Sequence, residues 1–489
     1  MDTKKLRQKV LDLAIHGKLV KQDPNDEPAS ILLDRIRAEK ARLVKEGKIK
    51  KSDLIEKPIS EEEIPFEVPE GWEWERWGNI SLSIQYGYNA PAEPTGDIKM
   101  VRITDIQNNK VLWDSVPFCK ISKEDIETYL LKPNDILFAR TGGTVGKSFL
   151  VNEVPEPSIY AGYLIRTRYS NSLNPKYMKY FMESELYWSQ LRDGTTSTAQ
   201  PNCNGKTLSK MILPLPPLAE QHRIVKAVDE LFEQIDIIER SEKELEEAAN
   251  KTRDKLLNLA IQGHLVPQDP NEEPASVLLE RIRAEKARLV KEGKLKKKDL
   301  EEKPISPDEI PFDIPEGWVW CRLKQICSKI IDGDHNPPAG LTSKTEYLMI
   351  SSKNINEDKL INLEDVRFLS KEVFEKEDLR TQARKDDILF TSVGSLGRSC
   401  IIQDNSLHLC FQRSVTILTT YIFNIFLKRY LDSPYVQSYV DEHSSGTAQK
   451  GFYLNQMELL LVPLPPLSEQ RRIVTKLEEL LHEIDKLKG

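Results

Sequence analysis

Apolar residues recur every three or four positions through residues 214–264, a segment that begins PLPPLAEQHRIV and ends LLNLAIQGHL. This spacing places about two residues in seven on one side of a helix, a narrow stripe that favours packing against one long helical partner. At roughly 1.5 Å per residue, the helix is on the order of 50 Å long from Ile224 to Leu259. We therefore predict a rigid spacer. Its packing stripe is expected to contain Ile224, Val228, Leu231, Ile235, Ile238, Leu245, Leu256 and Leu259.

A long internal repeat surrounds this segment. Residues 14–72 recur at 260–318, and the shared text includes AIHGKLVKQDPNDEPA and AIQGHLVPQDPNEEPA. In each copy a glycine after the apolar run predicts the end of a helix. A second helix is expected from about 30 to 47 and from about 276 to 293. The shared prolines and glycines indicate two half-molecules of the same design.

The start of the central helix also occurs twice, as PLPPLAEQHRIV and as PLPPLSEQRRIV near the C-terminus. The continuation that the second copy lacks is found at the N-terminus. We therefore predict a circular organisation, in which the N-terminal helix packs beside, or end to end with, the C-terminal helix. The result is two long antiparallel, coiled-coil-like helices related by a pseudo-two-fold axis. The expected stripe residues of the two end segments are Leu6, Val10, Leu13, Ile473, Leu477, Leu480, Ile484 and Leu487.

Two larger stretches lie between the helical segments. Both open with Pro-Glu-Gly-Trp and contain short strand-like runs, such as NDILFARTG and DDILFTSVG, separated by turn residues. We predict an α+β protein with two mixed α/β domains that display different surfaces. The expected segments are a helical region at 1–64 that completes the second repeat, a first domain at 65–213, a central helix and linker at 214–310, a second domain at 311–462 and a helix at 463–489.

Composition and charge narrow the function. The 489 residues carry a formal net charge of −7. The larger stretches are near neutral, with 15 Lys and Arg against 13 Asp and Glu in 78–213, and 17 against 18 in 322–462. The acidic helices favour protein partners, and DNA binding would require local basic patches. The absence of a long apolar run predicts a cytosolic protein without a membrane partner. The six cysteines lack metal-site spacing and are expected to be reduced thiols.

Three motifs suggest chemistry but fail in detail. The segment 142–148, GGTVGKS, lacks the first glycine of a P-loop and precedes a strand-like run, which favours a turn between strands that presents a cation. The segment 336–339, NPPA, lacks the aromatic residue that an amino-methyltransferase stacks on its target base. The segment 332–335, DGDH, is typical of a polar turn. No catalytic set and no metal site are expected, so the sequence indicates binding rather than catalysis.

The PLPPLxEQxxIV segments, the Pro-Glu-Gly-Trp openings, AIQGHLVPQDPNEEPA and the (N/D)DILF turns together resemble the specificity subunit of type I restriction-modification enzymes. The resemblance covers nearly the whole chain. It implies two target-recognition domains that each read one half of a bipartite double-stranded DNA target, in a chain that is not catalytic. It also implies modification subunits, which bind S-adenosylmethionine and methylate adenine, and restriction subunits, which use ATP and magnesium. No cofactor is therefore expected in this chain.

Under this interpretation the helix length sets the unread spacer, and the two half-sites differ because the two domain surfaces differ. The repeated helices near 30–47 and 276–293 are expected to dock two modification subunits. Two alternatives remain at the sequence level. The first is a two-headed scaffold that binds proteins or glycans, and the second, which the missing aromatic residue disfavours, is a self-contained methyltransferase.

Base reading needs Arg, Asn, Gln or Lys on loops, and phosphate contacts need Arg, Lys and hydroxyl groups. For each candidate a solvated surface role is the alternative, and Arg102 has a second alternative as the partner of Asp105. The predicted DNA-binding residues of the first domain are Tyr88, Asn89, Arg102, Gln107, Asn108, Arg140, Thr141, Lys147, Thr198 and Gln200. Those of the second domain are His335, Asn336, Lys353, Asn354, Ser392, Arg398, Gln449 and Lys450.

Overall fold

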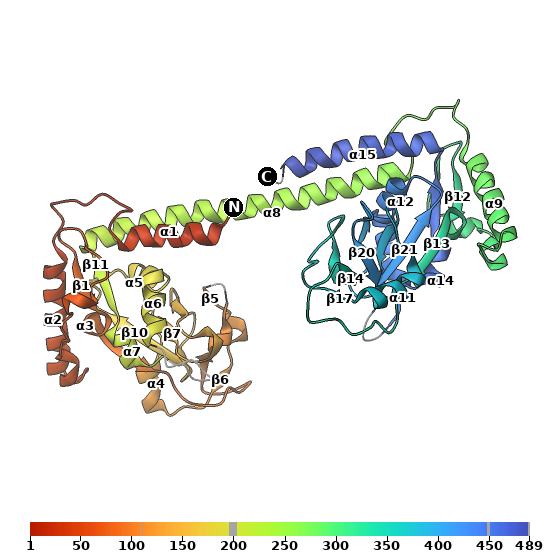
Figure 1. The fold of residues 1–489 in the computed structure, drawn as a ribbon. Helices are drawn as coiled ribbons and strands as arrows, with labels where there is room; N and C mark the ends of the chain where they lie inside the picture. Colours follow the sequence, from red (N-terminus) through yellow and green to blue (C-terminus); the bar gives the residue numbers. More distant parts are fainter. Residues whose placement is uncertain (108, 195–202, 447–449, 488–489) are drawn as a thin grey trace. The chain divides into compact units, whose positions relative to one another are not determined.

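The computed structural model divides the chain into two compact units, unit 1 (Met1–Glu242) and unit 2 (Lys243–Gly489). Helix α8 (Leu218–Ile261) begins in unit 1 and ends in unit 2 (Figure 1). Its 44 residues correspond to roughly 65 Å at about 1.5 Å per residue. The long helix predicted in this region is therefore present. The structure describes residues 1–107, 109–194, 203–446 and 450–487.

Unit 1 contains an antiparallel sheet of order β2-β10-β7-β8 and a smaller sheet of order β6-β3-β9, in which β3 and β9 are parallel. Strand β7, with the sequence ILFA, is buried along its whole length. The strands are β1 (Glu73–Arg76), β2 (Ser81–Tyr86), β3 (Ile98–Val101), β4 (Ile106–Gln107), β5 (Lys110–Val111), β6 (Phe118–Cys119), β7 (Ile136–Ala139), β8 (Ser148–Leu150), β9 (Ser158–Tyr160), β10 (Leu164–Tyr169) and β11 (Ile212–Leu215). The helices besides α8 are α1 (Thr3–Ile15), α2 (Ala29–Lys45), α3 (Trp77–Ile80), α4 (Lys123–Tyr129), α5 (Pro175–Phe181), α6 (Glu185–Gly194) and α7 (Gly205–Lys210).

Unit 2 contains sheets of order β13-β21-β18-β19, antiparallel throughout, and β17-β14-β20, in which β14 and β20 are parallel. The predicted mixed α/β content is thus present in both units. The strands are β12 (Val319–Arg322), β13 (Cys327–Asp332), β14 (Tyr347–Ile350), β15 (Ile355–Asn356), β16 (Lys359–Leu360), β17 (Arg367–Phe368), β18 (Ile388–Thr391), β19 (Ser399–Ile401), β20 (His408–Phe411), β21 (Val415–Thr420) and β22 (Leu461–Leu464). The helices are α9 (Ala275–Lys291), α10 (Leu323–Ile326), α11 (Lys371–Thr381), α12 (Asn424–Leu431), α13 (Pro434–His443), α14 (Leu454–Leu459) and α15 (Leu467–Leu487).

The first and last strands of each α/β part pair with each other. Strands β1 and β11 are antiparallel, with Trp74 opposite Pro214, and β12 and β22 form the same pair in unit 2. The two ends of the α/β part therefore lie side by side where they join the helical segments.

The repeated PLPPLxEQ segment forms the joint between a domain and its long helix. Its glutamate is buried in both units and accepts a hydrogen bond from the indole N–H of the Pro-Glu-Gly-Trp opening. The distance is 2.9 Å for Trp72 and Glu220 and also for Trp318 and Glu469. A buried carboxylate requires such a donor, because an unpaired one would be costly. The motif is therefore explained by architecture.

A glycine at each helix end completes the joint. Gly17 has a φ of +66°, a left-handed conformation that favours glycine, and a Cβ there would lie 2.3 Å from Cγ of Pro69. The amide of Gln22 donates to the Gly17 carbonyl (2.7 Å) and to Glu220 Oε1 (2.9 Å). This agrees with the helix end predicted from the glycine.

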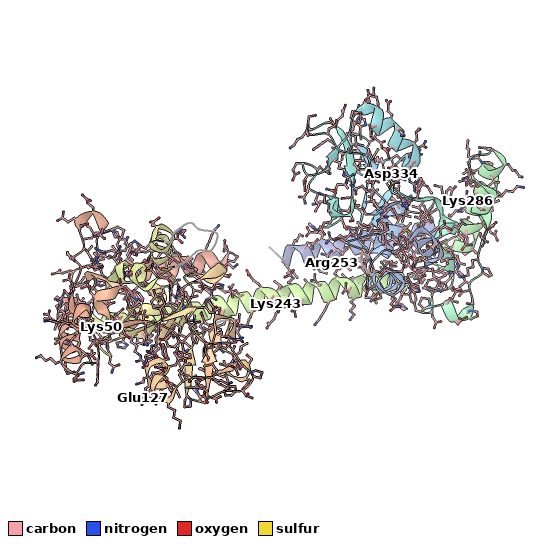
Figure 2. The ribbon with its side chains drawn as sticks, turned by 90° about the horizontal axis from the view of Figure 1, so that it is seen from below. Lys50, Glu127, Lys243, Arg253, Lys286 and Asp334 are labelled. Atoms are coloured by element: carbon pink, nitrogen blue, oxygen red, sulfur yellow. The ribbon has the colours of Figure 1, made fainter. Side chains whose placement is uncertain are left out.

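Helices α1 and α15 each run antiparallel to part of α8. In unit 1 the N-terminal ammonium of Met1 pairs with Glu242 at 2.9 Å, and Arg7 pairs with Asp236. In unit 2 Asp485, near the end of α15, pairs with Arg253 of α8 at 2.6 Å (Figure 2). Whether α1 continues α15 concerns the relation between the two units and stays a prediction.

The predicted packing stripe is only partly correct. A two-in-seven stripe assumes one partner along the whole helix, but α8 packs on α1 and also on α5, where Tyr180 contacts Phe232 at 5.6 Å between ring centroids. The buried surface therefore turns around the helix and includes Leu257, which lies outside the predicted stripe. Ile224, Val228, Ile235, Val10, Ile473, Leu477 and Ile484 are buried; Ile238, Leu256, Leu259, Leu13 and Leu480 are half-buried; Leu6, Leu231, Leu245 and Leu487 are exposed.

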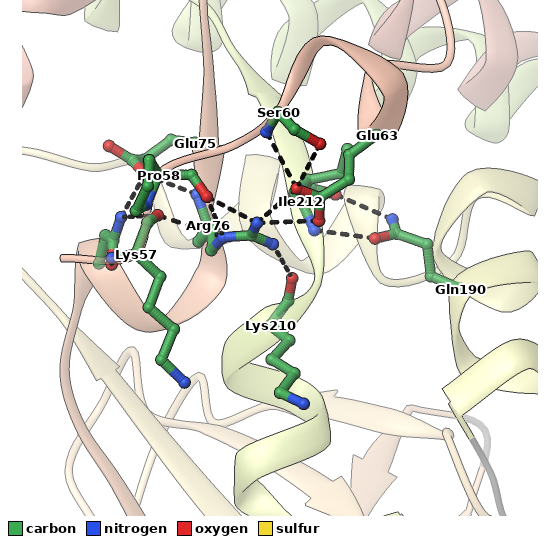
Figure 3. Close-up of polar contacts among 10 residues, drawn as sticks. Lys57, Pro58, Ser60, Glu63, Glu75, Arg76, Gln190, Lys210 and Ile212 are labelled. Carbon is green, nitrogen blue, oxygen red and sulfur yellow. Dashed lines mark hydrogen bonds and ion pairs between the residues drawn. The ribbon is translucent and has the colours of Figure 1, made fainter.

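A buried arginine ties the linker before each domain to the domain itself. In unit 1 the Arg76 guanidinium donates to the carbonyls of Lys57, Pro58 and Lys210 and pairs with Glu63 at 2.7 Å (Figure 3). The five guanidinium N–H groups form a planar fork that suits several acceptors at once. The interaction therefore joins the linker, β1 and the end of α7.

The glutamate of this network predicts a pH dependence. The backbone N–H of Ser60 and the Arg76 side chain lower the pKa of Glu63 from 4.5 to about 2. Because the folded-state pKa is depressed, its stabilising contribution is complete above pH 4.5 and is lost as the pH falls toward about 2. Carboxyl-carbon NMR should show a titration midpoint near 2. Arg76→Lys, which disturbs the guanidinium donor, should raise it, whereas Ser60→Ala removes only the hydroxyl donor, keeps the backbone N–H and should raise it less. A midpoint at the ordinary value in the native protein would contradict the network.

Candidate nucleic-acid interface

In unit 2 the short turn 412–414, between β20 and β21, holds three loops together. Its backbone and Ser414 hydroxyl bond to the loops that contain Asp334, Ser352 and Ser392, over distances of 2.8 to 3.1 Å. Loops that are distant in sequence therefore form one surface. This surface, here called the unit 2 face, consists of residues 332–336, 351–354, 392–398 and 412–414.

In unit 1 the turn 161–163 has the same role. Ala161 N–H donates to the Val101 carbonyl (2.9 Å), Gly162 N–H donates to that of Tyr88 (2.8 Å), and Arg140 N–H donates to that of Tyr163 (3.1 Å). The unit 1 face consists of residues 86–89, 101–105, 140–147 and 161–163. Both faces therefore have the same backbone frame, on which different side chains are displayed.

The glycine-rich segment of unit 1 is a turn between the antiparallel strands β7 and β8, as predicted. The Arg140 guanidinium lies over the Tyr86 ring, 4.8 Å from its centroid, and is half-buried. Its buried Nε has no hydrogen-bond partner among the described residues. Thr141 is half-buried and Lys147 is exposed. Of this predicted group, Lys147 is therefore the most accessible cation.

In the corresponding turn of unit 2, one predicted DNA contact is exposed and the other is buried. Arg398 is exposed, and one of its guanidinium N–H groups lies 3.5 Å from the Ile355 carbonyl oxygen. Ser392 is buried and its hydroxyl accepts a hydrogen bond from Thr416 at 3.0 Å. The prediction of Ser392 as a DNA contact was therefore wrong, because its side chain points into the domain.

In the short helical turns after β3 and β14, the predicted side chains bond to groups of the same or a nearby loop segment. Arg102 pairs with the buried Asp105 at 2.8 Å, which raises the pKa of the arginine. Of the two alternatives for Arg102, the pairing within the fold is therefore formed. Asn354 is buried, accepts from the Ser351 N–H and donates to two backbone carbonyls, so its prediction as a DNA contact was wrong.

The loops after β2 and β13 place one polar side chain each at the surface without a side-chain partner. Tyr88 is half-buried against Tyr129, with 5.2 Å between the ring centroids, whereas Asn89 is exposed. His335 is exposed and pairs with Asp332 at 2.8 Å, and Asn336 beside it is exposed. In the described structure the Asn336 backbone N–H donates to Asp334 Oδ1 at 3.1 Å, and no hydrogen bond is described for either amide side chain. Both amides are therefore accessible to a ligand.

The other predicted residues lie at the edges of the faces. Gln107 is exposed, Lys353 pairs with Asp365 at 3.1 Å, and Lys450 pairs with Asp441 at 3.0 Å. Both pairs are exposed, so a phosphate would replace the carboxylate at little cost. The predicted residues outside the described part of the chain are Asn108, Thr198, Gln200 and Gln449.

Sequence reasoning missed two exposed side chains on the central turns. Arg413 lies at the centre of the unit 2 face, and Tyr163 lies on the unit 1 face. Neither belongs to a motif. Only the position of each turn between two buried strands distinguishes them, and an aligned reading of the two halves, in which Gly162 corresponds to Arg413, would have found them.

The faces combine exposed arginine, lysine and amide groups on loops held by rigid strands. This set can donate to phosphate oxygens and to base edges. In residues 1–107, 109–194, 203–446 and 450–487, no three His, Cys, Asp or Glu side chains gather as a metal site would need. None of the described helices combines the length with the apolar composition that a bilayer span requires.

Comparisons of the sequence and of the fold with known proteins all point to one family. The family model for the type I restriction modification DNA specificity domain matches residues 88–247 and 315–488. The chain is 31% identical to the EcoAI specificity subunit of Escherichia coli and 30% identical to the EcoEI specificity subunit, in each case over 99% of this chain and 90% of the relative. A chain from a solved structure on assembly and conformational transition of the type I R-M system has a TM-score of 0.58 at 20% identity, and covers 87% of this chain and 93% of that chain. At that identity the structural likeness concerns the fold.

Proposed function

Because this chain belongs to the family of type I restriction-modification DNA specificity proteins, we propose that it is the DNA-recognition subunit of such a system. Units 1 and 2 each read one half of a bipartite target in double-stranded DNA through their faces. The observation that carries the proposal is the repetition of one backbone frame with different side chains, such as Gly162 in unit 1 and Arg413 in unit 2. The chain itself does not catalyse.

Different faces imply different half-sites. Unit 1 offers Asn89, Lys147 and Tyr163, whereas unit 2 offers Asn336 and two arginines at other positions. Since base identity is read by the pattern of donors and acceptors, these sets favour unlike sequences. The target is therefore asymmetric. Methylated-base sequencing of a cell that carries the system tests this, and a continuous or palindromic motif would overturn it.

Helix α8 sets the length of the unread spacer in this proposal. It is one uninterrupted helix of 44 residues, with α1 and α15 packed antiparallel on its two parts. Its middle, residues 241–248, is exposed along its whole length in the described structure. A helix with this continuity has a fixed rise per residue and so can act as a ruler.

Helices α2 and α9 are proposed to dock two copies of the modification subunit. Their sequences differ only at Ile31 or Val277 and at Asp34 or Glu280, and both apolar residues are exposed. On the inner side of α9, Lys286 donates to the Lys324 carbonyl at 2.7 Å (Figure 2). Near-identical outer faces should bind identical partners. S-adenosylmethionine, ATP and magnesium are expected on the modification and restriction subunits.

Removal of cations from the unit 2 face should weaken DNA binding. Arg398→Ala and Arg413→Ala are each expected to reduce affinity by about tenfold, the scale of one hydrogen bond to a charged group. Each should also reduce the slope of log affinity against log salt concentration by about one, because one phosphate contact is lost. Fluorescence anisotropy at two salt concentrations measures both effects. Arg140→Ala should act similarly, but it also removes the packing on Tyr86, so its effect is less direct.

The matched control is Arg281→Ala on the exposed side of α9, which removes the same charge away from both faces. It should leave DNA affinity unchanged. If Arg398→Ala and Arg413→Ala bind DNA like the native chain, with unchanged melting temperatures, the assignment of the unit 2 face is wrong. If the native chain did not bind DNA, or bound it with an affinity that does not depend on salt, a scaffold that binds proteins would be favoured.

A further inference from the structure

An ion-pair network in unit 2 connects a surface hairpin to two helices. Asp358 lies in the turn between β15 and β16 and accepts hydrogen bonds from Lys428 and Arg429 of α12, the latter at 2.6 Å. The Arg429 Nε also donates to Glu478 of α15 at 2.5 Å. Asp432 completes the set as a second partner of Lys428, at 2.6 Å. Charged contacts therefore run without a break from the hairpin through α12 to α15.

The hairpin contacts the loops of the unit 2 face and supports them. Strand β15 directly follows the turn with Lys353 and the buried Asn354, and the Ile355 carbonyl lies 3.5 Å from the Arg398 guanidinium. The backbones of Asp358 and Cys400 also pair as an isolated parallel β-bridge, and Cys400 lies two residues after Arg398. Whatever fixes the hairpin therefore also fixes the loops that present Lys353 and Arg398.

Unit 1 has the same hairpin without the carboxylate. The register of β4 and β5 pairs Gln107 with Lys110, as that of β15 and β16 pairs Asn356 with Lys359, so Asn109 corresponds to Asp358. Both turn residues have a positive φ, 56° and 63°. An asparagine amide carries no charge, and therefore cannot form the ion pairs that Asp358 makes.

The helix beside the unit 1 hairpin differs accordingly. Lys179 of α5 corresponds to Lys428 and pairs with Glu183 alone among the carboxylates described around it. The position of Arg429 is taken by Tyr180, which bonds to Asp229 of α8. A cavity of about 420 Å³, lined by Asn109, Lys179, Glu183 and Trp188 among others, lies between the hairpin and α5. Among the described residues of unit 1, no series of ion pairs therefore links this hairpin to α8.

The carboxylate of Asp358 is charged at neutral pH. Burial acts to raise the pKa of Asp358, but the positive charges of Lys428 and Arg429 outweigh it, and the pKa lies below its ordinary value. Lys428 is only 4% exposed, so water and salt screen its contacts less than those of a surface pair. The hairpin is therefore held more firmly than an exposed salt bridge would hold it.

We propose that Asp358 is a positioning residue for DNA recognition, which fixes the unit 2 face to α15, whereas Asn109 leaves the unit 1 face free to adjust. This inference rests on the proposed function. A face fixed to the helix accepts its half-site at one position only, and a face that can adjust tolerates a small displacement. Asp358 therefore narrows the range of spacer lengths that the subunit binds.

The test is a reciprocal exchange in the full chain, purified with its modification subunits. Asp358→Asn copies unit 1, and Asn109→Asp copies unit 2. Affinity is measured on the native target and on targets whose spacer is longer or shorter by one base pair. Asp358→Asn should reduce the affinity penalty for the wrong spacer by about fivefold, the scale of one partly buried ion pair, with a smaller change on the native target. Asn109→Asp should increase the penalty.

Folding and charge are controlled separately. The Lys179 and Glu183 pair shows that a buried lysine with one carboxylate is accommodated in this fold, so Asp358→Asn should fold and lower the melting temperature by no more than about 4 °C. Glu375→Gln removes the same charge from an exposed residue of α11 and should leave the penalty unchanged. An equal loss of affinity on all three DNAs, or an unchanged penalty, would overturn the inference alone. Failure of the native complex to bind any bipartite DNA would overturn the proposed function, and this inference with it.

Discussion

Arg322→Lys is expected to lower the stability of unit 2 by about 2–4 kcal/mol, because a lysine cannot reproduce the planar fork of a buried arginine. Arg322 is buried and donates to the carbonyls of Lys303, Pro304 and Leu459, and its pair with Glu309 has a distance of 2.8 Å. A lysine has three donors from one nitrogen and leaves carbonyl oxygens unpaired in the interior. Calorimetry should show a melting temperature lower by roughly 5–10 °C.

Two matched variants locate this effect. Arg76→Lys makes the same change in unit 1 and should destabilise that unit by a similar amount, since its contacts correspond one to one. Arg283→Lys changes an exposed arginine that pairs with Glu302 at 2.8 Å and should cost less than about 1 kcal/mol. If Arg322→Lys were no more destabilising than Arg283→Lys, the linker would not be held through this arginine.

Insertion of seven residues within 241–248 is expected to lengthen the unread spacer of the target by about three base pairs. Seven residues add about 10 Å of helix, and each base pair rises about 3.4 Å. Seven residues are also close to two full turns, so the packing surfaces beyond the insertion keep their direction to within about 20°. Because these residues are exposed, no buried side chain is displaced, and the described ion pairs in the segment, Met1 with Glu242 and Lys243 with Glu247, are exposed ones of little energetic weight. Methylated-base sequencing of cells with the variant chain measures the new target.

The control for the insertion replaces exposed residues of the same segment without any change of length. Ser241→Ala with Glu244→Ala should leave the spacer and both half-sites unchanged. Methylation at the original spacer after the insertion would show that α8 does not act as the ruler. Altered half-sites would show that the two faces depend on the helix for their base preference.

The sequence predicted the framework because local signals determine it. The glycine after the first apolar run ends a helix through its positive φ, which is a property of one residue. The long helix follows from periodicity over many residues. Leu245, in contrast, was expected on a packing stripe and is 43% exposed, because the pattern cannot show which helix covers which part of α8.

The faces were predicted less well because they depend on contacts between distant loops. Ser392 and Asn354 are polar residues on loops, yet both are buried, Ser392 by a bond to Thr416 on another strand and Asn354 by bonds to the carbonyls of the nearby Ile361 and Asn362. Arg413 became apparent only when its turn was seen to join three loops. Residue type indicates what a side chain can bind, but tertiary hydrogen bonds determine whether it is free to do so.

The antiparallel pair of β1 and β11 makes the whole α/β part an interchangeable module. Everything between Trp74 and Pro214 enters and leaves the helical frame at one place, through strands that pair mainly by backbone groups. An unrelated sequence that ends in the same two strands would fit the same frame. Recombination between genes at these shared boundaries would then exchange the surface proposed to recognise DNA in a single step and leave untouched the helices that are proposed to bind partner subunits. This accounts for boundary segments that match between the units while the residues between them hardly align.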